Sequence, residues 1–269
     1  MPLLEVNNIS FGYNQKDIIS DISFKVDKGE IFFLLGPNGC GKTTLLDCVL
    51  GILKPKNGTI SVNGTNIEGA QPKSIARQVA YVPQSHEKTF PYTVRDIVLM
   101  GRAAYIGMFS SPSDEDIAVV DEALSRVGIL NLRDRRYTEL SGGEGQLVMI
   151  ARALAQKTSL IVMDEPTAHL DFKHELVIME TIAELVREKG LSVLMATHFP
   201  NHAFYLENSN TATKVALMSN NRFLVTGSPS EVLSEENLKT IYKVNTRVVS
   251  YVIDADQELR QVIPISTDF

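Results

Sequence analysis

IFFLLGPNGCGKT, residues 31–43, is the stretch that decides the fold. Its first five residues are all apolar, which is typical of a fully buried strand. The glycine-rich turn GPNGCGKT, residues 36–43, follows directly and leads into a helical pattern from about Gly41 to Leu50. A buried strand, this glycine pattern and a helix together are the context that separates a phosphate-binding loop from a chance match. The sequence therefore predicts a phosphate-binding loop at residues 36–43.

The residue types in the loop suit phosphate binding. Glycines let backbone N–H groups surround the phosphates, and the helix N-terminus adds a partial positive charge. Lys42 is predicted to reach the β and γ phosphates, and the Thr43 hydroxyl to ligate Mg²⁺. The candidate ATP contacts here are Gly36, Pro37, Asn38, Gly39, Cys40, Gly41, Lys42, Thr43 and Thr44. The plain alternative is a strand-to-helix turn with a solvated lysine.

A second apolar strand ends in two carboxylates, in LIVMDEP, residues 160–166. Asp164 can hold Mg²⁺ through water, and Glu165 can act as general base on an attacking water. On their own, the two acids fit an exposed strand end or a helix cap equally well. Together with the phosphate-binding loop they predict a centre that hydrolyses ATP.

LSGGEGQ, residues 140–146, has two interpretations that can both hold. Ser141 and Glu144 fit a capping box at the start of a helix. A helix start does not need the glycines Gly142 and Gly143, which allow a ligand to approach bare N–H groups. Two phosphate-type sites in one chain suggest that each binds a different nucleotide.

Composition and length exclude several classes of protein. The chain has 269 residues, of which 44% are hydrophobic, and a net charge of −6 that argues against a nucleic-acid partner. Its apolar runs fall far short of the ~20 residues needed to cross a bilayer, and it begins without a secretory signal pattern. Cys40 and Cys48 would lie about 12 Å apart on one helix, too far for a disulfide. We therefore expect reduced thiols and a cytosolic location.

The order of the motifs resembles that of the ATPase subunits of ABC transporters, over nearly the whole chain. Gln84 matches the Gln-loop glutamine, residues 168–171 (AHLD) the D-loop, and His198 the switch histidine. Residues 140–144 match the family's signature motif. The resemblance implies a head-to-tail dimer of two copies, in which the signature of one copy clamps the γ-phosphate held by the other. The signature contacts it implies are Ser141, Gly142, Gly143 and Glu144.

Further roles come from the same resemblance. Tyr13 would stack on the adenine, Gln84 would sense Mg²⁺ and the attacking water, and His198 would orient Glu165. The candidate catalytic residues are Glu165, His198 and Gln84, and the candidate Mg²⁺ ligands are Thr43, Gln84 and Asp164. In the plainer alternatives Tyr13 is an ordinary strand residue and Gln84 a solvated one. A metal site at His198 and His202 lacks a third ligand and is disfavoured.

The implied fold is α/β: a P-loop NTPase (ABC ATPase) core with an N-terminal antiparallel β-subdomain and an inserted helical subdomain. Alternating strand and helix patterns after residue 158 indicate a parallel sheet with helices on both faces. We expect residues 1–245 to form the ATPase domain, with helices inserted at about 86–158. Residues 246–269 are expected to add a C-terminal β-hairpin around the turn DADQ.

Two segments are similar to one group of importers, those for iron-siderophore, haem, cobalamin and molybdate. They are GRAAY, residues 101–105, and IYKVNTRVV, residues 241–249. The similarity implies a multi-span membrane permease, indirectly a solute-binding protein, and a peripheral position on the cytoplasmic face of the membrane. Arg102 and Tyr105 either lie near the permease surface or are a helix-end charge and a packing aromatic. The alternative functions are a soluble ABC-type ATPase, for example in iron–sulfur assembly, and an ordinary P-loop kinase or GTPase.

Overall fold

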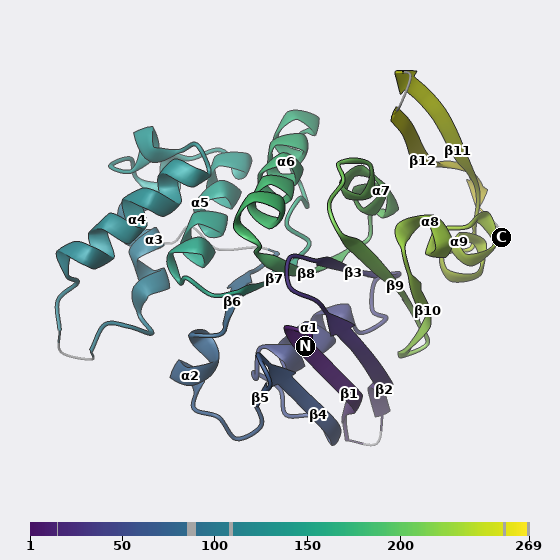
Figure 1. Ribbon diagram of the computed structural model, residues 1–269, viewed down its shortest axis with the longest axis horizontal. Coiled ribbons are helices and arrows are strands. Elements are labelled where there is room, and N and C mark those ends of the chain that lie inside the picture. Colours follow the sequence, from purple (N-terminus) through teal and green to yellow (C-terminus); the bar gives the residue numbers. More distant parts are fainter. Residues whose placement is uncertain (15, 85–89, 108–109, 255–256, 268–269) are drawn as a thin grey trace.

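A six-stranded sheet forms the centre of the molecule, and a second, antiparallel sheet packs against one side of it (Figure 1). The computed structural model describes residues 1–14, 16–84, 90–107, 110–254 and 257–267. The strands are β1 (Leu4–Tyr13), β2 (Lys16–Val26), β3 (Ile31–Leu35), β4 (Asn57–Val62), β5 (Thr65–Asn66), β6 (Val79–Val82), β7 (Leu160–Asp164), β8 (Ser192–Thr197), β9 (Thr213–Ser219), β10 (Arg222–Gly227), β11 (Val244–Asp254) and β12 (Gln257–Thr267). The α-helices are α1 (Lys42–Val49), α2 (Pro72–Ala76), α3 (Val94–Leu99), α4 (Asp114–Arg126), α5 (Gly142–Ala155), α6 (Phe172–Lys189), α7 (Pro200–Asn208), α8 (Pro229–Val232) and α9 (Glu235–Tyr242). Short 3-10 helices are η1 (Met100–Arg102), η2 (Leu130–Leu132) and η3 (Tyr137–Glu139).

The central sheet has the strand order β10-β9-β3-β8-β7-β6. Strands β9, β3, β8, β7 and β6 are parallel, and β10 pairs antiparallel with β9 at the edge. In β3, Phe33 faces one hydrophobic core and Phe32 the other. Strands β7 and β8 alternate in the same way, because a parallel strand covered on both faces is apolar throughout. The predicted parallel sheet with helices on both faces is confirmed.

The two faces of this sheet are covered differently. On one face lie α1 and the antiparallel sheet β2-β1-β4-β5, so the predicted N-terminal β-subdomain is confirmed. On the other face lie α6 and α7 (Figure 1). This arrangement places the start of α1 at the carboxyl end of β3, between the two sheets.

The helices α3, α4 and α5 pack on one another at the β6 end of the sheet (Figure 1). Thr93, Ser113 and Ser141 begin these helices, each with a reciprocal capping box. They fall within the range predicted for the helical insertion. The predicted start of the insertion, at about residue 86, lies outside the described residues. No helix in the described part of the chain has the length and apolar character to span a bilayer.

The C-terminal region contains more structure than the sequence predicts. Strand β10 follows β9 through a tight turn at Asn220 and Asn221, both with positive φ, 48° and 68°. Asparagine tolerates this conformation, which such two-residue hairpin turns require. Strands β11 and β12 form the expected hairpin, although residues 255–256 of its DADQ turn lie outside the described ranges. The side chain of Asn201 at the start of α7 accepts a hydrogen bond from the Val262 amide (2.8 Å) and donates one to its carbonyl (3.2 Å).

Candidate nucleotide-binding and hydrolysis site

The loop between β3 and α1 is a tight backbone turn in which glycine is required. Gly39 and Gly41 have φ values of 79° and 105°, which side chains disfavour. A Cβ on Gly41 would also lie 2.8 Å from the carbonyl oxygen of Ile18. Residue 36 has no room for a Cβ either, because the carbonyl of Met218 on β9 blocks it. The loop is therefore fixed by its neighbours before any ligand binds.

Lys42 bends back over this loop. Its side chain is only 7% exposed, and Nζ donates hydrogen bonds to the carbonyl oxygens of Gly36 (2.7 Å) and Pro37 (3.3 Å). These contacts use two of the three hydrogen-bond donors of the ammonium group and hold its positive charge beside the N–H groups of the loop. An anionic phosphate is the natural partner for such a site.

Thr43 and Asp164 meet although 121 residues separate them in the sequence. The Thr43 hydroxyl donates a 2.8 Å hydrogen bond to Asp164 Oδ2. Burial raises the pKa of Asp164, the Thr43 hydrogen bond opposes this, and the negative charge of Glu165 adds to the increase. A hydroxyl and a desolvated carboxylate are hard oxygen donors of the kind that Mg²⁺ takes. The residues present therefore fit a magnesium ion.

Glu165 and His198 form the second close pair. His198 Nδ1 lies 2.8 Å from Glu165 Oε2, and the His198 amide also donates to this oxygen, at 3.3 Å. Glu165 is buried and has a φ of 46°, an uncommon conformation for a non-glycine residue. Its own amide donates to the carbonyl of Ala196 on β8, at 2.8 Å. Backbone held in a sparsely populated conformation is typical of functional sites.

A cavity of about 190 Å³ brings most of these residues together. Gln84 opens onto it from the end of β6, opposite the phosphate-binding loop. The cavity is lined by Ile18, Asn38, Gly39, Gly41, Lys42, Thr43, Thr44, Gln84, Asp164 and Glu165. A lysine, a hydroxyl, an amide and two carboxylates around one small space suit phosphoryl chemistry.

The predicted signature lies elsewhere, at the start of α5. Ser141 is the N-cap: its amide donates to Glu144 Oε2 (2.9 Å), and its hydroxyl accepts from the Glu144 amide (3.2 Å). The Ser141 amide hydrogen bond is the main reason why the pKa of Glu144 is lowered. The capping box is thus present, and none of residues 141–144 lines the cavity around Lys42.

Residues 19–168, more than half of the chain, match the family model described as ABC transporter. The chain belongs to the ABC transporter family.

Relatives and solved structures agree with this family over most of the length. The "Probable iron chelatin transport ATP-binding protein" of Helicobacter pylori (strain 26695) is 36% identical over 89% of this chain and 99% of its own. The iron(3+)-hydroxamate import ATP-binding protein of Bacillus subtilis is 34% identical, over 93% and 91%. An inward-facing ABC transporter structure, assigned to the metal-chelate type, matches with a TM-score of 0.85 and 32% identity over 98% of both chains. The fold is that of an ABC ATPase, and the chain is an ATP-binding, ATP-hydrolysing protein.

Two other candidates in this ABC ATPase lie apart from the cavity. Tyr13, at the end of β1, is 59% exposed and makes an edge-to-face contact with Phe11 at 5.1 Å between ring centroids. Its outer ring face is thus open to solvent. His202 is not paired with His198: its Nε2 lies 2.7 Å from Glu175 Oε1. The described residues hold no cluster of three or more His, Cys, Asp or Glu side chains placed to bind one metal ion.

Arg102 is not a surface residue of the ABC ATPase. It is 6% exposed and donates to Asp116 Oδ1 (2.9 Å) and to the carbonyl of Ala155 (3.0 Å). The half-exposed Tyr105 packs its ring under the guanidinium at 4.0 Å and donates to the Gln156 carbonyl at 2.9 Å. Arg102 thus stands at the end of η1 as a charge held within the chain, and Tyr105 packs against it, as in the second interpretation; a permease surface near them stays a prediction.

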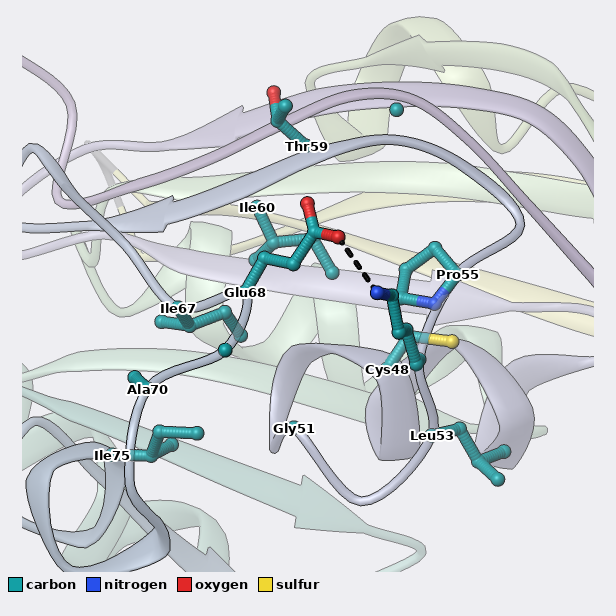
Figure 2. A pocket seen from close by; sticks show the side chains of 13 residues that line it. Cys48, Gly51, Leu53, Pro55, Thr59, Ile60, Ile67, Glu68, Ala70 and Ile75 are labelled. Carbon is teal, nitrogen blue, oxygen red and sulfur yellow. Dashed lines mark ion pairs between the residues drawn. The ribbon is translucent and has the colours of Figure 1, made fainter.

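A separate hollow of about 240 Å³ lies between the C-terminal end of α1 and residues 67–75 (Figure 2). It is mostly apolar, and an ion pair between Lys54 and Glu68 (3.1 Å) crosses it. Burial raises the pKa of Cys48 beside it to about 12, so the thiol stays protonated. Cys40 and Cys48 are both free, as predicted. Unlike the cavity around Lys42, which two carboxylates line, this hollow is lined by one carboxylate, Glu68, and that carboxylate is paired with Lys54.

Two residues near the functional segments were not among the site residues predicted from the sequence. Tyr242 on α9 is close enough to Cys40 and Glu165 for both to raise its pKa, beyond the larger effect of burial. His174 on α6 occupies the space beside Gly143. No local motif marks either residue, because both reach the site through tertiary packing.

Proposed function

We propose that the chain is the ATPase subunit that powers uptake of a metal-chelate type solute through a separate multi-span membrane permease. The solute classes are iron-siderophore, haem, cobalamin and molybdate. The observation that carries the proposal is the match over 98% of both chains to a transporter of the metal-chelate type. The named iron-chelate relatives, at 34–36% identity, support the same assignment.

In this proposal the cavity around Lys42 holds the ATP phosphates. Lys42 exchanges its carbonyl partners for phosphate oxygens, and the open face of Tyr13 stacks on the adenine. Thr43, Asp164 and Gln84 would hold Mg²⁺, which would supply positive charge beside the phosphates. The loop amides of residues 36–44 supply the remaining contacts, as the conformation of the turn favours.

Glu165 is the proposed general base for the attacking water. Its short contact with His198 keeps the carboxylate oriented, and its buried backbone is fixed by the bond to Ala196. Gln84 faces the same cavity and is placed to position that water. Rigid placement of these groups lowers the entropic part of the barrier.

A second copy of the chain is the proposed partner that completes the site. Residues 141–144 do not line the cavity of their own chain. Their N-cap, glycines and helix N-terminus suit a phosphate brought by another subunit. We therefore propose a head-to-tail dimer that closes on ATP and is peripheral to the membrane on its cytoplasmic side, beneath the permease. A solute-binding protein delivers the solute to that permease.

The test is reconstitution with the permease encoded beside the gene. Vesicles that contain ATP inside should accumulate one of the four solute classes, and vesicles with the Glu165→Gln chain should not. Co-purification with a soluble iron–sulfur assembly partner instead, with no uptake of any class, would overturn the importer assignment.

A further inference from the structure

His174 packs against the signature within the same chain. A Cβ added to Gly143 would clash with the imidazole ring of His174 and would lie 2.7 Å from the His174 Cβ. The neighbouring Gly142 differs, since a Cβ there would meet only Leu170 Cδ2, at an ordinary 3.6 Å. From the sequence, both glycines were predicted to let a ligand approach the backbone N–H groups. Gly143 has a second reason to be glycine, which is the ring of His174.

Asp171 fixes the ring that fills this space. Its carboxylate is the N-cap of α6 and accepts from the His174 amide at 2.9 Å. The same oxygen lies 2.8 Å from His174 Nδ1. These two contacts leave the ring little freedom, because one carboxylate oxygen holds both its backbone and its side chain. Asp171 is the last residue of the D-loop, residues 168–171.

The D-loop and the signature therefore share one packed contact. Leu170 lies against Gly142 and His174 against Gly143, so both glycines of the signature rest on the segment 170–174. His174 is also close enough to Glu144 to help lower the pKa of that carboxylate, after the larger effects of Ser141 and Arg135. Close-packed contacts without free space transmit displacement rather than absorb it.

We propose that His174 is a positioning residue that sets the placement of the signature according to the position of the D-loop. A shift of Asp171 carries the His174 ring with it, and the ring moves the backbone at Gly143. The inference rests on the proposed dimer, in which residues 141–144 bind the nucleotide of the second copy. Its consequence is that the loss of His174 weakens ATP-driven dimerisation without weakening ATP binding by the single chain.

The experiment uses the full chain carrying Glu165→Gln, which should trap ATP-bound dimers. In this background His174→Ala removes both the ring and its bond to Asp171. The matched control is Lys173→Ala, since Lys173 is exposed on the same turn of α6. Dimer formation is measured against protein concentration with ATP, and ATP affinity is measured at concentrations where the chain is monomeric. A melting temperature for each variant reports its folding.

We expect His174→Ala to need about tenfold more protein for half-maximal dimer, which corresponds to about 1.4 kcal/mol. ATP affinity and the Lys173→Ala control should match the parent. An equal dimerisation curve for His174→Ala would overturn the inference. If the parent itself forms no ATP-dependent dimer, the proposed function fails, which is a different result from failure of the inference.

If His174→Ala folds poorly, the substitution Gly143→Ala, alone and combined with His174→Gly, tests the inference instead. Gly143→Ala alone should abolish the dimer, because its methyl group clashes with His174. Adding His174→Gly removes the ring and its Cβ and should restore dimerisation. The double variant should need at most about ten times the parent's protein concentration for half-maximal dimer. If the double variant stays as inactive as Gly143→Ala, His174 does not limit the placement of Gly143 and the inference is wrong.

Discussion

Glu165 and His198 stand at the ends of neighbouring strands, β7 and β8, where their side chains meet over the cavity. Glu165→Gln should lower ATP hydrolysis by about 10²- to 10⁴-fold, because the amide cannot accept a proton from water. Steady-state phosphate release at saturating ATP measures this loss. Nucleotide binding is the internal control, since the amide is isosteric and should leave it intact. Persistence of full hydrolysis would remove Glu165 from the role of base.

Asp164 gives a second residue-scale prediction, for the chain without nucleotide and Mg²⁺. Because its folded-state pKa is raised by burial, the ionised carboxylate lowers stability at neutral pH. Asp164→Asn should therefore raise the melting temperature at pH 7. The gain should shrink as pH falls towards the ordinary value of 3.8, where the carboxyl is protonated in both states. An unchanged melting temperature at pH 7 would contradict the prediction.

The sequence predicted most of the residues around the cavity, together with a chemical reason for each residue type. Lys42, Thr43, Asp164 and Gln84 come together as the motif order implied, and their roles in catalysis stay predictions. The burial of Arg102 could not be predicted, because it depends on Asp116 and Ala155 in other helices. Residues with a chemical role can be found from local motifs, whereas the packing of a residue depends on partners that are distant in the sequence.

At the scale of elements, the ion pair of Arg102 and Asp116 joins η1 to α4. Hydrogen bonds from the Ser113 backbone and from Arg102 lower the pKa of Asp116 to about 2. A lowered carboxyl pKa stabilises the fold above the ordinary value of 3.8, and this contribution is lost as pH falls towards 2. Arg102→Met should thus lower the melting temperature most above pH 4, with the difference from wild type shrinking near pH 2.

The matched control for this prediction is Arg126→Met on the same helix α4. Arg126 pairs with Glu122 one turn away, on the surface, and such pairs contribute about 0.5 kcal/mol or less. Its melting temperature should stay close to wild type at every pH. A pH-independent loss in Arg102→Met would mean that the hydrogen bond to Ala155 and the cation-π contact with Tyr105, rather than the ion pair, account for the stabilisation.

Element boundaries followed the strength of the local signal. Apolar periodicity predicts helices at residues 94–100, 116–127 and 147–155, and the capping box places the start of the last one at Ser141. The structure begins α4 two residues before its periodic segment, at Asp114. Strand β10 was missed because its apolar residues, 223–225, are consecutive rather than alternating with polar ones, although Asn220 and Asn221 carry a hairpin-turn signal. Helices α8 and α9 are short and depend on tertiary contacts for stability.

At the scale of the whole molecule, the C-terminal hairpin is attached to α7 by Asn201. Asn201→Ala should increase hydrogen exchange at the Val262 amide by about 5- to 30-fold, since it removes hydrogen bonds that together contribute ~1–2 kcal/mol. The control is Asn208→Ala on the same helix, for which the described part of the chain gives no side-chain hydrogen bond. Unchanged protection at Val262 in Asn201→Ala would show that the hairpin is held by its apolar contacts alone.

The alternation along β3 has a thermodynamic consequence for the entire molecule. One strand supplies Phe32 to the core under the antiparallel sheet and Phe33 to the core under the helices. The two cores thus share strand β3. If either core unfolds, β3 loses the packing contacts on one of its two faces. Heating should accordingly give a single calorimetric endotherm, with the calorimetric and van't Hoff enthalpies equal. Two resolved endotherms would mean that the halves melt as independent units.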